Sequence, residues 1–195
     1  MMLEAADALV TRNRTLPGDS APVSLCDLGY CSVGVDEGWE GCGAGVNGTQ
    51  HDAQGHPTID KKSFPDVASM VDQIHMKGLA AGWYLNGCKC GEHVEVDVNY
   101  EGDIADLHKF KFDGVKIDGC GRQRNQTFYA ELMAHTGKAY TIENWCACHR
   151  SLATLAALAQ ESRNALPSRA SLTVTLHSSP FTLTHTLHPS PFTPH

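Results

Sequence analysis

Helical and strand patterns alternate along the chain between residues 65 and 145, and this alternation constrains the fold more than any other feature. Apolar residues at helical spacing follow Pro65, and a nearly continuous apolar run comes directly after them at residues 79–85. The succession repeats twice more, with strands predicted at residues 114–117 and 139–142 and an earlier strand at 31–35. Helix and strand units with short connections build a parallel sheet. The sequence therefore predicts an α/β fold.

The charged residues divide the chain of 195 residues into two segments. All 22 acidic residues lie at or before Glu161, and beyond it only Arg163 and Arg169 carry charge. The rest of that end is rich in Ser, Thr, Leu, Pro and His and has no apolar period, which is typical of disorder. We therefore expect a folded domain at residues 1–160, closed by a helix at 151–160, and a low-complexity disordered tail at 161–195.

The overall acidity restricts the partners of the chain. Its formal net charge is −7, whereas nucleic acids and anionic membranes attract cationic surfaces. We expect neither as a partner. The sequence favours no particular oligomeric state.

Eight cysteines and three Asn-x-Thr sequons, at Asn13, Asn47 and Asn125, favour an oxidising compartment. The first residues contain an early acid and no apolar stretch, so they do not form a secretory signal. We expect the natural start of the chain to be missing. Cys88-x-Cys90 and Cys146-x-Cys148 also raise zinc as an alternative, but zinc sites usually space thiolates by two or more residues, and we predict no metal and no cofactor.

Polar and aromatic side chains stand at the end of every predicted strand. The carboxyl ends of parallel strands meet at one edge of a sheet, where active sites form. We therefore expect one shared mouth, lined by Asp36, Glu37 and Trp39, by Tyr84 and Asn86, by Lys116 and Asp118, and by Glu143 and Asn144.

Lys116 and Asp118 alternate on one strand, so both side chains face the same side, about 7 Å apart along it. An ammonium near a carboxylate keeps that carboxylate ionised, which suits a nucleophile. A buried structural salt bridge is the alternative. The expected convergence of Asp36, Glu37 and Tyr84 on the same mouth favours the nucleophile.

The order and spacing of these motifs resemble the family-27 glycoside hydrolases, the group of α-galactosidases (melibiases) and α-N-acetylgalactosaminidases. The matching motifs are Val35-Asp36-Glu37-Gly38-Trp39, Phe64-Pro65, Lys77-Gly78-Leu79, Gly82-Trp83-Tyr84 and Val115-Lys116-Ile117-Asp118-Gly119-Cys120. The likeness runs over roughly residues 3–145. It implies a partial (β/α)8 TIM barrel, about half of one, and an α-galactoside carbohydrate as the substrate.

The resemblance implies a role for each residue of the mouth. Asp118 would be the nucleophile of a retaining α-galactosidase, Tyr84 would orient it, and Lys116 would hold a sugar hydroxyl. Asp36 and Glu37 would accept the galactose 4- and 6-hydroxyls. The remaining site residues are Trp39, as a sugar-binding wall or as core packing, and Glu143 and Asn144, with Asn144 at the 2-hydroxyl when the sequences are aligned on Trp145.

Departures from the family pattern limit what this chain is expected to do. Retaining chemistry needs a second carboxyl about 5 Å from the nucleophile, and in the family it lies beyond the matching region. We therefore expect no turnover by this chain alone, and a catalytically dead sugar-binding remnant or an α-N-acetylgalactosaminidase are the alternatives. A phosphoryl-transferring aspartate is disfavoured, because Asp118 is not followed by the second Asp of an Asp-x-Asp motif.

The resemblance also implies where the whole protein resides and how its cysteines pair. The location would be secreted or lysosome- or vacuole-like. The disulfide next to the nucleophile would be Cys90–Cys120, with Cys88 as the alternative partner of Cys120.

Overall fold

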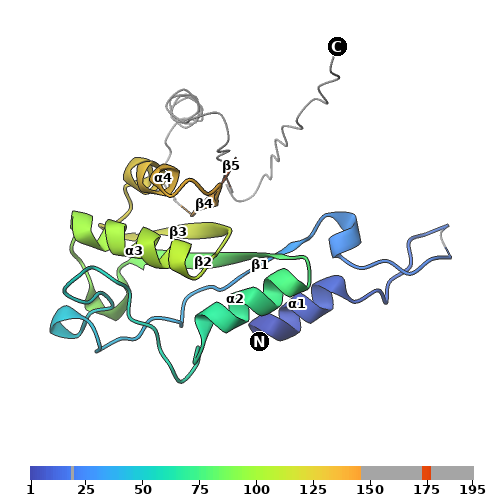
Figure 1. Ribbon diagram of the computed structural model, residues 1–195, viewed down its shortest axis with the longest axis horizontal. Coiled ribbons are helices and arrows are strands. Elements are labelled where there is room, and N and C mark those ends of the chain that lie inside the picture. The colour runs from blue at the N-terminus through green and yellow to red at the C-terminus, as the bar shows by residue number, and fades with distance from the viewer. Residues whose placement is uncertain (19, 146–172, 177–195) are drawn as a thin grey trace, which may run out of the picture.

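The computed structural model describes residues 1–18, 20–145 and 173–176, and in these the strands form one parallel sheet in chain order (Figure 1). The strands are β1 (Ser32–Gly34), β2 (Ala80–Gly87), β3 (Gly114–Gly121), β4 (Thr141–Trp145) and β5 (Thr173–Leu176). The helices are α1 (Met2–Val10), α2 (Val67–Met76), α3 (Asp97–Lys109) and α4 (Gln126–His135). The predicted α/β fold of alternating helices and strands is confirmed.

Local signals fix the ends of the helices that connect the strands. The Asp66 carboxylate accepts the Ser69 backbone N–H at 2.9 Å and begins α2, and the Asn125 side chain caps α4 in the same way. Gly78 and Gly137 follow these two helices with φ angles of 76° and 74°, a region that glycine occupies without strain. Each of these two helices therefore ends a few residues before the next strand begins.

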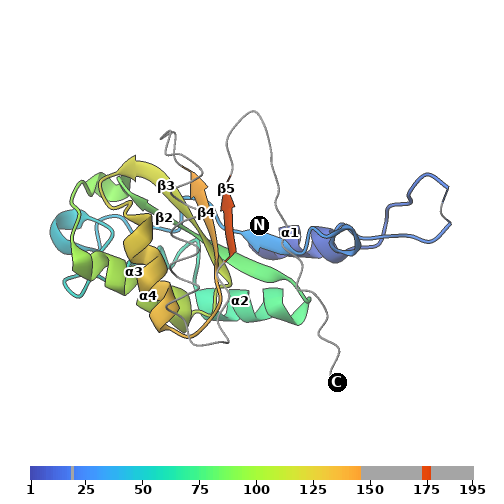
Figure 2. The ribbon, with the colours of Figure 1, turned by 90° about the horizontal axis from the view of Figure 1, so that it is seen from above.

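The hydrophobic core lies between the sheet and its helices. Val115 and Ile117 of β3 are buried, whereas Lys116 between them is only partly buried. The buried cluster joins Val115 and Ile117 to Val71 of α2 and Leu107 of α3, and Figure 2 shows the helices along one face of the sheet. Since successive strand residues point to opposite faces, Lys116 is directed to the face that the helices leave open.

A long segment at residues 35–66 connects β1 to α2. It is folded by short antiparallel bridges, between Glu40 and Ile59 and between His51 and Pro57. It also packs closely on α3, where a Cβ added to Gly102 would clash with the carbonyl group of Gly55. The segment is thereby held beside the carboxyl ends of β1 and β2.

The structure differs from the sequence prediction within the expected tail. Residues Thr173–Leu176 pair in parallel with β4 as β5, where we predicted disorder. Their Thr-Val-Thr-Leu pattern is rich in β-branched residues, which favour strands, and β4 offers them an edge to pair with. The remainder of 161–195 and the predicted helix at 151–160 lie outside the described residues.

No helix among the described residues is long and apolar enough to cross a membrane.

Candidate functional site

Tyr84, Lys116 and Glu143, three of the residues predicted for the mouth, lie on the face of the sheet opposite the helices. Tyr84 of β2 pairs in register with Lys116 of β3, and Lys116 pairs with Glu143 of β4. Paired positions of neighbouring strands face the same side, so these residues form one row, and Asp118 follows one row nearer the carboxyl ends. The predicted convergence of Tyr84, Lys116 and Asp118 with Asp36 agrees with this arrangement.

A cavity of about 380 Å³ opens on this face, and Asp36, Lys116 and Glu143 contribute to its wall. One row deeper in the sheet, glycines pair across three strands, Gly34 with Gly82 and Gly82 with Gly114. Because glycine has no side chain, this row leaves space beneath the polar groups. A ligand of small size can therefore lie against the strands themselves.

The Asp118 carboxylate is oriented by two donors. The Tyr84 hydroxyl donates to Asp118 Oδ2 at 2.6 Å, and the Cys120 backbone N–H donates to Oδ1 at 3.2 Å. Burial, together with the bond to Asp118, raises the pKa of the Tyr84 phenol. The phenol therefore stays protonated as a donor, and it fixes one carboxylate oxygen while the other is held less tightly.

Lys116 and Asp36 form a second polar pair at the mouth. Lys116 Nζ donates to Asp36 Oδ2 at 2.8 Å and lies 4.8 Å from the centre of the Tyr84 ring. The hydrogen bond from Lys116 is the largest cause of a lowered pKa of Asp36. The Asp36 side chain is 66% exposed and that of Lys116 is 23% exposed, so a ligand in the mouth can reach the ionised pair.

The structure separates the two remaining residues of the Asp36 motif. Glu37 is 58% exposed and its Oε1 lies 3.5 Å from Lys89 Nζ. Trp39 is only 3% exposed, its indole N–H donates to the Tyr84 carbonyl oxygen at 2.9 Å, and its ring packs against Trp83. Trp39 thus lies in the core behind the mouth, where it supports the backbone of Tyr84.

Glu143 and Asn144 occupy neighbouring positions on β4. Glu143 is partly buried and lines the cavity. The backbone of Asn144 pairs in register with Ile117. The predicted roles of both residues toward a sugar stay predictions.

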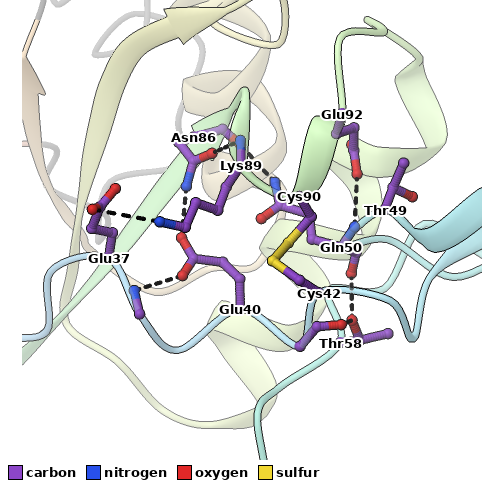
Figure 3. The surroundings of a disulfide bond; sticks show 12 residues. Glu37, Glu40, Cys42, Thr49, Gln50, Thr58, Asn86, Lys89, Cys90 and Glu92 are labelled. Carbon is purple, nitrogen blue, oxygen red and sulfur yellow. Dashed lines mark hydrogen bonds and ion pairs between the residues drawn. A yellow bond between two sulfur atoms is a disulfide. The ribbon is translucent and has the colours of Figure 1, made fainter.

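The predicted disulfide Cys90–Cys120 is wrong, and the alternative partner is the correct one. Cys120 pairs with Cys88, while Cys90 pairs with Cys42 (Figure 3). The strand register explains the choice, because Gly87 pairs with Gly121. This pairing brings Cys88, which follows Gly87, beside Cys120, which precedes Gly121. Cys90 lies two residues further on, in a turn with a φ of 58°, and reaches the segment after β1 instead.

A third disulfide joins Cys26 to Cys31. Cys146 and Cys148 lie outside the described residues. Within the described part of the chain, no group of three or more His, Cys, Asp or Glu side chains is arranged to hold a metal ion.

Polar residues around the Cys42–Cys90 disulfide extend the site beyond the predicted roles (Figure 3). Asn86 Nδ2 donates to Glu40 Oε1 at 2.8 Å, and Glu40 Oε2 accepts the Gly38 backbone N–H at 2.7 Å. Asn86 Oδ1 accepts the backbone N–H of Lys89 at 2.8 Å. The sequence predicts Asn86 at the mouth, because it stands at a strand end, but it predicts no role for this residue. Glu40 and Lys89 belong to no periodic pattern, so the sequence does not identify them as site residues.

A buried ionic cluster ties the segment at residues 35–66 to α3. His51 Nδ1 lies 2.6 Å from Glu92 Oε1, and His51 Nε2 lies 3.0 Å from Asp103 Oδ1. Burial by itself lowers the pKa of His51, but the hydrogen bonds to Asp103 and Glu92 outweigh it and raise that pKa to about 10. The imidazole is therefore a buried cation between two carboxylates.

The chain resembles known proteins by structure rather than by sequence. No protein-family model and no curated protein matches the sequence. Among solved structures, the chain is similar to an α-galactosidase from Saccharomyces cerevisiae solved with raffinose, with a TM-score of 0.56 and 18% identity. It is also similar to α-galactosidase I from Mortierella vinacea, with a TM-score of 0.54 and 25% identity.

Both similarities cover 74% of this chain, but only 30% of the yeast enzyme and 36% of the Mortierella enzyme. The chain thus spans about a third of the length of the solved structures that it matches. The polar row and the nucleophile candidate lie within a fold that these enzymes share. The described chain therefore has the fold of part of the TIM barrel of α-galactosidases.

Proposed function

We propose that the mouth binds terminal α-D-galactosyl residues and that Asp118 is the nucleophile of a retaining α-galactosidase. The observation that carries this proposal is the Asp118 carboxylate, which the Tyr84 phenol holds through one oxygen at 2.6 Å, on the face of the sheet where Lys116 and Asp36 line a cavity. The likeness of the fold to α-galactosidase barrels supports it. Raffinose, which is present in the yeast structure, is itself an α-galactoside.

We assign a separate task to each polar group. Asp118 Oδ1 attacks the anomeric carbon, since Oδ2 is occupied by Tyr84. Asp36 accepts a sugar hydroxyl, and Lys116, beside it at 2.8 Å, donates to a sugar oxygen. As the bond from Oδ1 to the anomeric carbon forms, the bond to the leaving group breaks, and the leaving group departs with the electron pair.

A natural leaving group must also be protonated, which is the task of a second carboxyl about 5 Å from the nucleophile. No residue of this chain is predicted to supply that carboxyl. This favours sugar binding without turnover as the second candidate function for the chain by itself. The two candidates differ in whether Asp118 can form a covalent bond to a sugar.

Alpha-galactosyl fluoride distinguishes them, because fluoride leaves without a proton from an acid. We expect the full 195-residue chain to gain the mass of one galactosyl unit and to release about one equivalent of fluoride. Without a base to activate water, the adduct should persist. Intact mass spectrometry and peptide mapping would locate it on Asp118.

The glucosyl fluoride, which differs only at the 4-hydroxyl, is the matched control reagent and should label the chain far more slowly. Binding of methyl α-galactoside without any adduct would favour the sugar-binding candidate. An adduct on another residue, or no difference between the two fluorides, would contradict the proposed assignment of Asp118 and of the mouth.

We also propose that the whole protein is secreted or lies in a lysosome- or vacuole-like compartment. The three disulfides among the described residues support this location, because disulfides persist in oxidising compartments. The asparagines of the three sequons are all exposed, as glycosylation there would require.

A further inference from the structure

The geometry around the Cys42–Cys90 disulfide points to a specificity role for a residue outside the predicted set. We propose that Lys89 is a positioning residue, which holds the Glu37 carboxylate in place to accept a hydroxyl of the galactosyl ring. This inference rests on the proposed function. Through Glu37, Lys89 would contribute to the preference of the mouth for a galactosyl ring.

Lys89 has an unusually restricted backbone. Cys88 and Cys90, its two neighbours, are cross-linked to different segments, one to Cys120 after the nucleophile and one to Cys42 after the Glu37 motif. Its backbone N–H is donated to Asn86 Oδ1 at 2.8 Å. The Lys89 side chain therefore starts from a fixed point between the nucleophile and Glu37.

The side chain of Lys89 extends from that point toward Glu37 (Figure 3), and the two charged atoms lie 3.5 Å apart. Both groups remain open to solvent, with Lys89 38% exposed and Glu37 58% exposed. Exposed ion pairs contribute only about 0–1 kcal/mol to folding. Stability therefore gives little reason for the pair. Its place beside the mouth gives a better one, because Glu37 directly follows Asp36 and donates its backbone N–H to Asp36 Oδ1 at 2.8 Å.

Glu37 needs such a restraint more than a shorter acid would. Compared with the neighbouring Asp36, the extra methylene of Glu37 adds a rotatable bond whose freedom must be lost when a sugar binds. The backbone around Glu37 is already fixed, because Glu40 accepts the Gly38 N–H and is itself held by Asn86. Lys89 engages Oε1, which leaves Oε2 to accept a sugar hydroxyl.

The test is a titration of the full chain with methyl α-galactoside and with its 4-deoxy and 6-deoxy analogues, followed by NMR. We expect Lys89→Met to weaken binding of the parent sugar about three- to fivefold, the scale of an exposed ion pair. Lys89→Arg should restore it. Lys62→Met, which removes an exposed lysine of the segment before α2, is the matched control and should bind as the wild type does.

Two further comparisons separate positioning from a general structural effect. The loss of affinity caused by Lys89→Met should vanish for the one deoxy sugar that lacks the hydroxyl accepted by Glu37. The same substitution should also have no effect on affinity in a Glu37→Gln background. A Lys89→Met protein that binds like the wild type, or one that loses affinity equally for all three sugars, would overturn the inference alone. A wild-type chain that binds no galactoside would overturn the proposed function and this inference with it.

Discussion

Asp118→Asn is expected to abolish covalent labelling of the chain by α-galactosyl fluoride. The amide that replaces the carboxylate is a poor nucleophile, because its oxygen carries no formal charge. Loss of an attacking group lowers rates by factors on the order of 10⁵ to 10⁶ in enzymes where this has been measured. The measurement is fluoride release together with intact mass, in which the variant should show neither an adduct nor release above background.

The substitution is nearly isosteric, so it separates chemistry from binding. The amide oxygen of the variant can still accept the Tyr84 hydroxyl that Asp118 Oδ2 accepts, and we expect methyl α-galactoside to bind with little change. Asp72→Asn, on the outer surface of α2 where Asp72 pairs with Lys111, is the matched control and should be labelled like the wild type. Undiminished labelling of the Asp118 variant would show that another group attacks.

The sequence predicts the sheet and the row of polar residues because both depend on short-range periodicity. Apolar runs define β2 and β3, and the alternation of side chains along a strand places Lys116 and Asp118 on the face opposite Val115 and Ile117. The order of the strands then brings Tyr84 to within 2.6 Å of Asp118. None of these steps requires knowledge of a loop.

The residues that the sequence did not identify are held by loops. The choice between Cys88 and Cys90 depends on one residue of register and on a turn at Lys89–Gly91, which no periodic pattern encodes. His51 is separated from Glu92 by 41 residues and from Asp103 by 52. Only the close packing of residues 35–66 on α3 brings these three together.

Replacing His51, the cation of the buried ionic cluster with Glu92 and Asp103, is expected to cost more stability than any surface substitution. His51→Gln removes a positive charge between Glu92 and Asp103 while keeping a hydrogen-bonding group of similar size. Two buried carboxylates then face each other without compensation, and breaking a buried pair in this way costs about 3–5 kcal/mol. The measurement is the free energy of unfolding from urea titration with the disulfides intact.

The pH dependence of this loss tests its electrostatic origin. In the folded state the pKa of His51 is raised to about 10 from an ordinary value of 6.5, so its contribution is complete below pH 6.5 and is lost as the pH rises toward 10. The difference in unfolding free energy between the wild type and His51→Gln should therefore narrow over that range. His75→Gln, which removes a half-buried partner of Asp113 at 2.7 Å, is the matched control and should cost about 1 kcal/mol or less. A difference for His51→Gln that stays constant from pH 6.5 to 10 would mean that lost packing, and not lost charge, destabilises the variant.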